Sequence, residues 1–502
     1  MNHVKDRSAS IFGNVIPSSV VRAGEKKKAS YAKKFAHDKN ARYSFLAAEN
    51  AVLTSTLGVR VLQLNEHAQI VCEDKNDVEN TKIDVEKGVI VGNIRMGFGH
   101  YRIAMAIASA AKAAGLKPYW FDLVSFPNTT ASKVISHLNG LYSLGSRLSQ
   151  RSSLFNKFYW EPLNYEGFKK LSFNAQDQKV SELFATVCKG LPQNMPFFGT
   201  HVWPAQAAVH AGMKNVVNIV PDNWPMALHL AEGSLHLVQS QSAYMGYRML
   251  REMDKSRFTL KPIPASEIAY VGHFVDHEIV SNISADCERR LERLRLGKAR
   301  RVLLSVGGAG AQQDYFVSML KKILPLAESG KIVLFLNFGD HRKMWDEMIA
   351  AVPSLKRLAT CHFDRWSATS DFATNAIDGE VSGVHAFCDS DIFAAVYLSN
   401  ILMRASDLLV TKPSELSYYP VPKLFIKRVG GHEMWGAIRG AELGDGTIQC
   451  ENVDFAVQAL ELLVNESDLL CLQIQSILNL NSIGAYNGAY EAVRRAMERK
   501  NE

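Results

Sequence analysis

The sequence lacks the marks of a secreted or membrane-spanning protein. Its seven cysteines form no Cys-x-x-Cys pair, which argues against a disulfide framework or a cysteine-rich zinc site and favours a reducing compartment. No signal-peptide core follows the charged residues Lys5, Asp6 and Arg7. No window approaches the roughly 18 uncharged apolar residues that a membrane span requires. These absences predict a cytoplasmic protein.

The bulk composition predicts several ordinary globular domains. Apolar residues make up 47% and charged residues 21% of the 502 residues, as in typical soluble domains. A chain of this length is expected to hold roughly two to four domains. No short-period repeat or low-complexity array is present.

Positive charge is concentrated at the N-terminus. Residues 1–42 hold ten Lys or Arg and three Asp or Glu, a balance of +7. The whole chain also carries +7, so residues 43–502 are neutral in sum. This leader predicts peripheral contact with an anionic surface, for which we expect a membrane and no nucleic acid. The alternative is a solvated or disordered arm without a partner.

A glycine-rich turn opens the first regular unit of the chain, "KGVIVGNIRMGFGHYRIAMAIASAAKAAG" (residues 87–115). The β-branched run 89–91 predicts a buried parallel strand. Apolar residues then recur at helical spacing from Ile103, with Gly115 as the stop. The turn ends in His100, so it is not a full dinucleotide-binding fingerprint. A helix N-terminus after such a turn suits an anion.

Strand and helix patterns alternate over the rest of the chain. Apolar runs followed by polar turns include "KPYWFDLV", "NVVNIVPD", "SLHLVQS" and "EIAYVGH", and helical patterns separate them. The pattern restarts with a second glycine turn in "RVLLSVGGAGAQQDYFVSMLKKIL". This alternation predicts α/β structure with mainly parallel sheets. We expect two Rossmann-like domains that face each other across a cleft, with a boundary near residues 276–298.

Residues just after strand ends are the candidate site, because doubly wound sheets bind ligands there. In the first half these positions hold His100, His201, Asp222 and Trp224, a polar and aromatic rim. Each of them could instead make a local cap or turn, as an N-cap by Asp222 would.

The corresponding positions of the second half suit a nucleotide. The turn with Gly307, Gly308 and Gly310 allows a diphosphate to approach backbone N–H groups, although tight strand–helix packing would also explain it. Glu415 follows another strand and could accept hydrogen bonds from ribose hydroxyls. Further candidates are Lys412 and Ser414 beside it, and Gly431, His432 and Glu433 at a later helix start.

The order of these segments resembles the two-domain GT-B glycosyltransferases, in particular the group of monogalactosyldiacylglycerol synthases, diacylglycerol glucosyltransferases and the lipid II-forming N-acetylglucosaminyltransferase. The matching segments are "GFGHYRIAMAIASAAKAAG", "GTHVWPAQAA", "VVNIVPDNWPMALHLAEGSLHLVQSQSA", "IAYVGHFVDHEI", "VLLSVGGAGAQQ", "SDLLVTKPSE" and "GGHEMWGAIRGAELGDG". The resemblance covers about residues 88–465.

The resemblance implies how the chain is divided into domains and which substrate each domain binds. It implies an N-terminal acceptor domain (86–276), a linker (277–298) and a C-terminal donor domain (299–465). A basic leader and extension (1–85) would precede them, and closing helices (466–502) would follow.

The implied reaction transfers a sugar from a nucleotide sugar, with UDP-sugar expected, to a lipid or other amphipathic acceptor. His100 would position or deprotonate the acceptor hydroxyl, and Asp222 competes for the role of base. Gly97, Gly99, His201 and Trp224 would lie on the acceptor side. We expect no Asp-x-Asp motif at a strand end as a metal site, so a metal-independent, inverting transfer without a cofactor is expected.

The donor segment departs from the family pattern. "TKPSELSYYPVPKLF" lacks the Gly-Gly pair that usually follows Lys-Pro and is about four residues shorter, so Glu415 matches the family glutamate only across a gap. The family's later Gln or Glu with a nearby Asn is His432-Glu433 with Gly436 here. Two alternatives therefore stay open: a nucleotide-sugar 2-epimerase of the same fold, and a non-catalytic binding protein. The aromatic stretch "NKFYWEPLNYEGF" is expected to be buried, with contact at lipid headgroups as the alternative.

Overall fold

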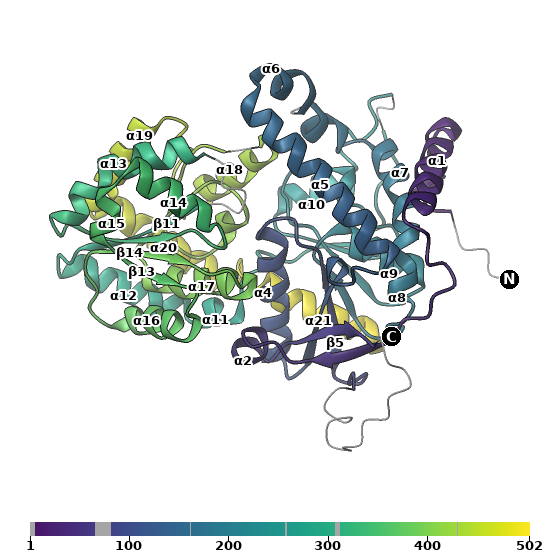
Figure 1. Ribbon diagram of the computed structural model, residues 1–502, viewed down its shortest axis with the longest axis horizontal. Helices are drawn as coiled ribbons and strands as arrows, with labels where there is room; N and C mark the ends of the chain where they lie inside the picture. Colours follow the sequence, from purple (N-terminus) through teal and green to yellow (C-terminus); the bar gives the residue numbers. More distant parts are fainter. Residues whose placement is uncertain are drawn as a thin grey trace. The chain divides into compact units, whose positions relative to one another are not determined.

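The computed structural model describes residues 6–65, 82–160, 162–256, 259–306, 312–428 and 430–501. The chain forms two compact units (Figure 1). Unit 1 comprises residues 1–96, 103–272 and 488–502. Unit 2 comprises residues 97–102 and 273–487, so the short segment at the first glycine turn belongs to it.

Unit 1 is built on an eight-stranded sheet with the strand order β10-β9-β8-β7-β5-β6-β4-β3. All of its pairings are parallel except that of β3 with β4. The strands are β3 (Phe45–Ala48), β4 (Arg60–Leu64), β5 (Gly88–Asn93), β6 (Lys117–Asp122), β7 (Phe197–Gly199), β8 (Val216–Ile219), β9 (Leu235–Val238) and β10 (Ile268–Tyr270). A separate hairpin pairs β1 (Ser10–Ile11) with β2 (Asn14–Val15). Val89, Ile90 and Val91 of β5 are fully buried, as expected for a parallel strand covered on both faces.

The helices of unit 1 connect these strands. They are α1 (Ser18–Lys34), α2 (Leu53–Leu57), α4 (Gly99–Ala113), α5 (Thr130–Arg151), α6 (Ser153–Phe155), α7 (Leu171–Ser181), α8 (Ala185–Cys188), α9 (Val202–Ala211), α10 (Gln241–Arg248) and α21 (Gly488–Asn501). Gly115 follows α4 at φ +76°, a left-handed conformation that suits a helix stop at glycine.

The basic leader is folded in the described residues from Asp6 onward. Its helix α1 packs on α7 so closely that a Cβ on Gly24 would lie 3.1 Å from Gln176 Cα. Lys28 of α1 forms an ion pair with Glu182. The alternative of a disordered arm is therefore wrong for residues 18–34.

Unit 2 is built on a six-stranded sheet in which every pairing is parallel, with the order β13-β14-β12-β11-β15-β16. The strands are β11 (Arg300–Ser305), β12 (Ile332–Asn337), β13 (Ala359–Phe363), β14 (Val384–Cys388), β15 (Leu408–Thr411) and β16 (Lys423–Phe425). The helices are α11 (His277–Val280), α12 (Ile283–Arg295), α13 (Gln313–Glu328), α14 (Arg342–Ala351), α15 (Ser354–Leu358), α16 (Trp366–Asp378), α17 (Ile392–Ala405), α18 (Met434–Leu443), α19 (Val453–Asn465) and α20 (Asp468–Ser482). Figure 1 shows α13 and α14 on one side of this sheet and α12 and α16 on the other.

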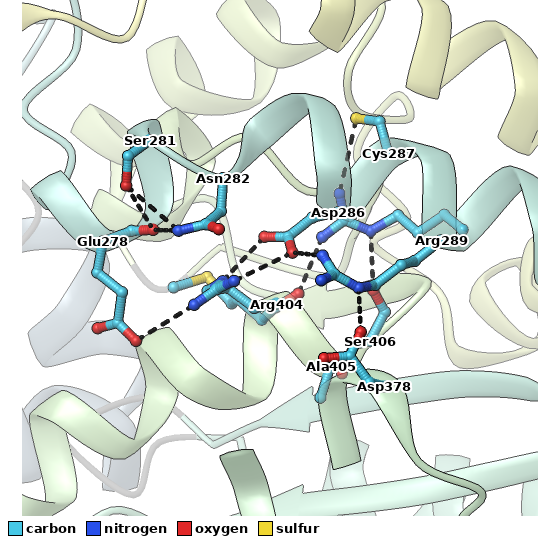
Figure 2. Close-up of polar contacts among 12 residues, drawn as sticks. Glu278, Ser281, Asn282, Asp286, Cys287, Arg289, Asp378, Arg404, Ala405 and Ser406 are labelled. Carbon is cyan, nitrogen blue, oxygen red and sulfur yellow. Dashed lines mark hydrogen bonds and ion pairs between the residues drawn. The ribbon is translucent and has the colours of Figure 1, made fainter. Parts of the chain in front are cut away.

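Arginines join α12 to the C-terminal end of α17 in unit 2 (Figure 2). The buried Arg290 donates to the carbonyl oxygens of Ser406 at 2.9 Å and Met403 at 3.0 Å. Both carbonyls lie at the C-terminal end of α17, where the last carbonyl groups lack an i+4 partner; the Met403 oxygen also accepts from the Ser406 N–H at 3.4 Å. Arg404 pairs with Asp286 at 3.1 Å and Glu278 at 3.5 Å. This network joins α11 and α12 to the end of α17 and lies away from the carboxyl ends of the strands.

The two parallel sheets with their helices confirm the predicted fold class, α/β with two Rossmann-like domains. Every apolar run quoted above as a strand forms one. The stretch 340–400 adds two further units, β13–α16 and β14–α17, to the edge of the second sheet. Asp389-Ser390-Asp391 follows β14 directly, which corrects the expectation that no Asp-x-Asp motif lies at a strand end. Asp389 accepts from the Asp391 N–H at 2.9 Å, and Asp391 caps α17.

Candidate functional site

The sheet of unit 2 reverses its winding between β11 and β15. From β11 the chain runs to β12 on one side, and it later returns to β15 on the other side of β11. The two strands pair in register, Leu304 with Val410, so the loops that follow them leave the sheet side by side. Such a switch point is where open α/β sheets bind their ligands.

Three predicted donor residues lie in the loop after β15. Lys412, Ser414 and Glu415 follow Thr411 directly, and all three are partly buried. The Ser414 N–H donates to the carbonyl oxygen of Lys412 at 2.8 Å, which makes a tight turn. The strand before this turn pairs with β11, which the sequence segment with Gly307, Gly308 and Gly310 follows. Those three glycines lie outside the described residues.

The start of α18 approaches the same turn. Glu433, 7% exposed at its side chain, forms an ion pair with Lys412, and its Oε2 accepts from the Gly430 N–H at 3.3 Å. A Cβ on Gly436 would lie 3.1 Å from the Pro413 carbonyl oxygen, so glycine permits this approach. The structure thus brings together the predicted residues Lys412, Gly431 and Glu433. His432 belongs to the same turn, but its side chain lies outside what the structure describes.

The arrangement gives the carboxyl edge of unit 2 a cation and a helix N-terminus at one place. An ammonium group and free backbone N–H groups both attract phosphate oxygens. Glu433 occupies both of them in the structure, since it pairs with Lys412 and accepts from Gly430.

Glu415 has a charged partner that sequence reasoning missed. Arg102, 2% exposed, holds its Nε 3.8 Å from Glu415 Oε1 and donates from Nη1 to Asn400 Oδ1 at 3.4 Å. A Cβ on Gly99 would lie 3.3 Å from Glu415 Oε2. Unit 2 therefore brings the predicted residues Gly99 and Glu415 together. The signal in the sequence was an arginine on the apolar start of a helix, where a charge needs a buried partner.

A buried acid and phenol adjoin this arginine. Tyr419 donates from its hydroxyl to Asp276 Oδ2 at 2.9 Å, and the Arg102 guanidinium lies 5.7 Å from the centre of the Tyr419 ring. Burial raises the pKa of Asp276 to about 6, against the lowering effect of the Tyr419 hydrogen bond and of Arg102. This cluster holds Arg102 in position toward Glu415.

The sheet of unit 1 has its own switch point, between β5 and β7. The loop after β5 leads to Gly97, Gly99 and His100, and the His100 side chain is partly buried. The loop after β7 holds His201. Its Nδ1 accepts from the Trp203 N–H at 3.1 Å and caps α9, so the cap considered as an alternative is present there.

The loop after β8 holds Asp222 and Trp224. Asp222 does not cap a helix; its Oδ2 lies 3.0 Å from His229 Nε2. The Trp224 ring is 7% exposed and lies 4.8 Å from the ammonium of Lys169. His229 and Lys169 were not predicted as site residues, because they lie away from strand ends in sequence.

Two cavities lie away from the carboxyl edges. One of about 400 Å³ is lined by residues of α12, the start of β11 and the end of α16 in unit 2. One of about 420 Å³ lies between α4 and α21 in unit 1. Among the described residues no group of three or more His, Cys, Asp or Glu could hold a metal ion. No helix within the same part of the chain has the length and apolar character of a membrane span.

Two family models match the chain. Residues 10–249 match a domain of unknown function (DUF6937), and residues 263–497 match a second domain of unknown function (DUF6938). No curated protein sequence matches significantly.

Several solved structures are similar to the chain at low identity. UDP-GlcNAc 2-epimerase from Neisseria meningitidis, bound to UDP-GlcNAc, is 12% identical at a TM-score of 0.43, covering 82% of this chain and 100% of its own. The α,α-trehalose 6-phosphate synthase from Burkholderia multivorans is 10% identical at a TM-score of 0.40, covering 82% of this chain and 99% of the synthase chain. A glycosyltransferase from Rickettsia africae is 12% identical at a TM-score of 0.40, covering 82% of this chain and 98% of the glycosyltransferase chain. Likenesses of this size carry no argument about the reaction, so the fold assignment rests on the two sheets themselves.

Proposed function

We propose that the protein is a glycosyltransferase that moves a sugar from a nucleotide sugar, preferably a UDP-sugar, to a lipid or other amphipathic acceptor. The observation that carries the proposal is the switch point of unit 2, where Lys412 and Glu415 follow β15 next to the end of β11 and Lys412 pairs with Glu433 at the start of α18. The ordered resemblance of motifs supports the same assignment.

On the donor side, the diphosphate would bind Lys412 and the N-terminus of α18. Its oxygens would replace the Glu433 carboxylate as the partner of the ammonium, because the diphosphate carries two negative charges against one and also interacts favourably with the helix dipole. The turn with Gly307, Gly308 and Gly310 would supply further N–H groups. Glu415 would accept from ribose hydroxyls, with Arg102 fixing its carboxylate in place.

On the acceptor side, His100 or Asp222 would take the hydroxyl proton. The acceptor oxygen forms a bond to the anomeric carbon while the bond from that carbon to the diphosphate breaks. The electron pair leaves with the diphosphate, and the proton goes to His100 or Asp222. A single displacement of this kind inverts the configuration. Charge that develops on the leaving oxygen would be stabilised by Lys412 and the helix N-terminus, so the transfer needs no metal ion.

The basic leader would bring the protein to a lipid acceptor. Arg22, Lys26, Lys33 and Lys34 on α1 are exposed and would contact an anionic membrane from its cytoplasmic side. Each basic residue near such a surface contributes about 1 kcal/mol, and salt screens the attraction. Replacing Lys26, Lys33 and Lys34 by Gln should weaken binding to acidic vesicles while α1 stays folded, because none of them packs against α7. Equal binding before and after the change would remove the leader from this role.

The release of nucleoside diphosphate tests the reaction. A transferase releases it in proportion to acceptor, whereas a 2-epimerase interconverts nucleotide sugars without acceptor, and a binding protein does neither. We expect release only when the nucleotide sugar and a lipid acceptor are both present. Turnover of the nucleotide sugar alone would replace the proposal by the epimerase, and binding without turnover would replace it by a non-catalytic protein.

A further inference from the structure

Unit 1 carries a row of exposed apolar side chains on the helical insert between β6 and α7. Leu141, Leu144 and Leu148 on α5 are 42–51% exposed, and Leu154, Phe158 and Tyr159 after it are 59–71% exposed. We call these six residues the apolar ridge. A contiguous group of large apolar side chains on a protein surface marks an interaction site.

The apolar ridge is held by a folded hairpin of helices. Tyr142 on α5 packs against Trp160 at a ring distance of 5.0 Å. A Cβ on Gly145 would lie 2.1 Å from the Trp160 ring, so glycine is needed where the returning segment crosses α5. In this packing Tyr142 and Trp160 contact each other, whereas Phe158 and Tyr159 are exposed to solvent. The expectation of a buried aromatic core is therefore wrong for Phe158 and Tyr159.

The two halves of α5 differ in what they pack against. Ala131, Val134 and Ile135 in the first half are fully buried in the core of unit 1. In the second half the leucines recur at positions 141, 144 and 148, one face of a helix. Figure 1 shows α5 continuing to α6. The first half anchors the insert, and the second half presents the apolar ridge.

The positive charge around the apolar ridge indicates what kind of partner it contacts. The insert between β6 and α7, residues 123–170, contains six Lys or Arg and two Asp or Glu. Lys157 is exposed and lies with its ammonium 5.7 Å from the centre of the Phe158 ring. Self-association through this face would bring like charges together, which is unfavourable. Cations beside exposed leucines and aromatics instead suit the boundary between anionic headgroups and acyl chains.

The basic helix α1 adjoins the same face. Lys34 Nζ lies 3.3 Å from His137 Nε2 on α5, one helical turn before Leu141. The rings of Tyr31 and Phe35 also contact His137, at 6.0 Å and 5.6 Å. The C-terminal end of α1, with its cation Lys34, therefore lies beside α5 within unit 1, one helical turn before the apolar ridge begins.

We propose that the apolar ridge inserts into the surface of an anionic lipid membrane, with the cations of α1 and Lys157 contacting the headgroups. Leucine and aromatic side chains gain free energy by leaving water, and the basic groups gain by meeting anionic lipid, so the two contributions reinforce each other. This docking surface rests on the proposed function for the contact of α1 with a membrane. Vesicle binding requires no turnover, so loss of docking and loss of the transfer reaction are measured separately.

The test compares two triple variants of the full chain in sedimentation with vesicles. The ridge variant carries Leu144→Glu, Leu154→Glu and Phe158→Glu. The control variant carries Ile448→Glu, Leu472→Glu and Ile483→Glu in unit 2, at side chains 65–77% exposed, so both variants gain the same charge on exposed apolar positions. Vesicles of phosphatidylglycerol with phosphatidylcholine are compared with pure phosphatidylcholine.

We expect the ridge variant to lose roughly tenfold or more of its partitioning onto phosphatidylglycerol vesicles, while the control variant loses little beyond the effect of added charge. Both should unfold at the temperature of the wild type, because no buried residue changes. Equal partitioning of the two variants would overturn the proposal, as would failure of the wild type to bind these vesicles. A concentration-dependent dimer that the ridge variant abolishes, without vesicle binding by the wild type, would assign the ridge to a second copy of the chain.

Discussion

The carboxyl edges of the two sheets use their polar residues differently. In unit 1 the edge is held mainly by histidines, as in the His201 cap on α9 and the pair of Asp222 with His229. In unit 2 the edge is held by Lys412 with Glu433 and by Arg102 with Glu415. The first set consists of imidazoles and a carboxylate, the kinds of side chain that serve as general acids and bases, whereas the second can balance the permanent charge of a diphosphate.

This difference suggests how two related sheets divide one reaction. Two Rossmann-like sheets offer equivalent switch points, so the fold alone does not say which one binds a nucleotide. The residues at each edge make the distinction, since an ammonium and a helix N-terminus converge only in the edge described for unit 2.

The largest expected effect is on turnover, through the edge of unit 1 and the loop after β5. His100→Ala or Asp222→Asn should lower turnover on the order of 10²-fold or more, because the acceptor hydroxyl loses its base. Nucleotide affinity should change little. Steady-state rates and nucleotide titrations measure the two quantities separately. The controls His277→Ala and Asp346→Asn alter exposed residues of unit 2 and should leave turnover intact; near-wild-type rates in both test variants would remove these residues from the chemistry.

A second effect concerns stability in acid. Burial lowers the pKa of His236 in unit 1 to about 4, while its Nε2 accepts from the Ala231 N–H at 3.0 Å. Its folded pKa lies below the unfolded value near 6.5, so its contribution is present above pH 6.5 and is lost as the pH falls toward 4. The loss should reach on the order of 2 kcal/mol. Asp276 in unit 2 has the opposite effect on stability. Its pKa is raised in the folded state, so its protonation in acid increases the free energy of unfolding.

Denaturant unfolding at pH 7 and pH 4.5 checks this prediction. His236→Gln keeps an acceptor for Ala231 and cannot gain a proton, so its free energy of unfolding should depend less steeply on pH than that of the wild type. The control His277→Gln replaces an exposed histidine and should keep the wild-type slope. Equal slopes for His236→Gln and wild type would show that His236 is not held neutral by burial.

A smaller effect is expected at the edge of unit 2. Glu415→Ala removes the proposed ribose acceptor and should weaken nucleotide binding about tenfold, the value of one charge-assisted hydrogen bond. Gly308→Val, outside the described residues, should weaken it as well by blocking the approach of a diphosphate. The control Glu380→Ala changes a carboxylate that is 78% exposed. Calorimetric titration with nucleoside diphosphate compares the three, and unchanged affinity in folded Glu415→Ala protein would place the donor elsewhere.

The sequence was most informative where strands are buried on both faces. The run at Val89–Val91 and the one after Arg301 are short, apolar and bounded by glycine, so their strands could be predicted. The edge strand β13 could not, because Thr360 and Cys361 are exposed and no buried run marks it. Lys412 and Glu415 were found because they follow a recognisable strand.

Contacts between distant segments could not be predicted. Nothing in the sequence pairs Arg102 with Glu415, or Lys412 with Glu433, since hundreds of residues or a whole loop separate them and only the folded chain joins them. The apolar ridge was missed for a related reason: its leucines have the same helical spacing as a core-facing stripe, and burial depends on what packs against α5.

The central claim is that the carboxyl edge of unit 2 binds a nucleoside diphosphate, and it is tested most directly by thermal unfolding with UDP, GDP and TDP. The wild type is compared with Lys412→Met and with Lys322→Met, a control at an exposed lysine of α13 that pairs with Asp454. We predict that UDP, among the three, stabilises the wild type and the control by roughly 2.7 kcal/mol at 100 times its dissociation constant. The same concentration should stabilise Lys412→Met much less. Stabilisation by none of the three, or equal stabilisation of Lys412→Met, would contradict the account.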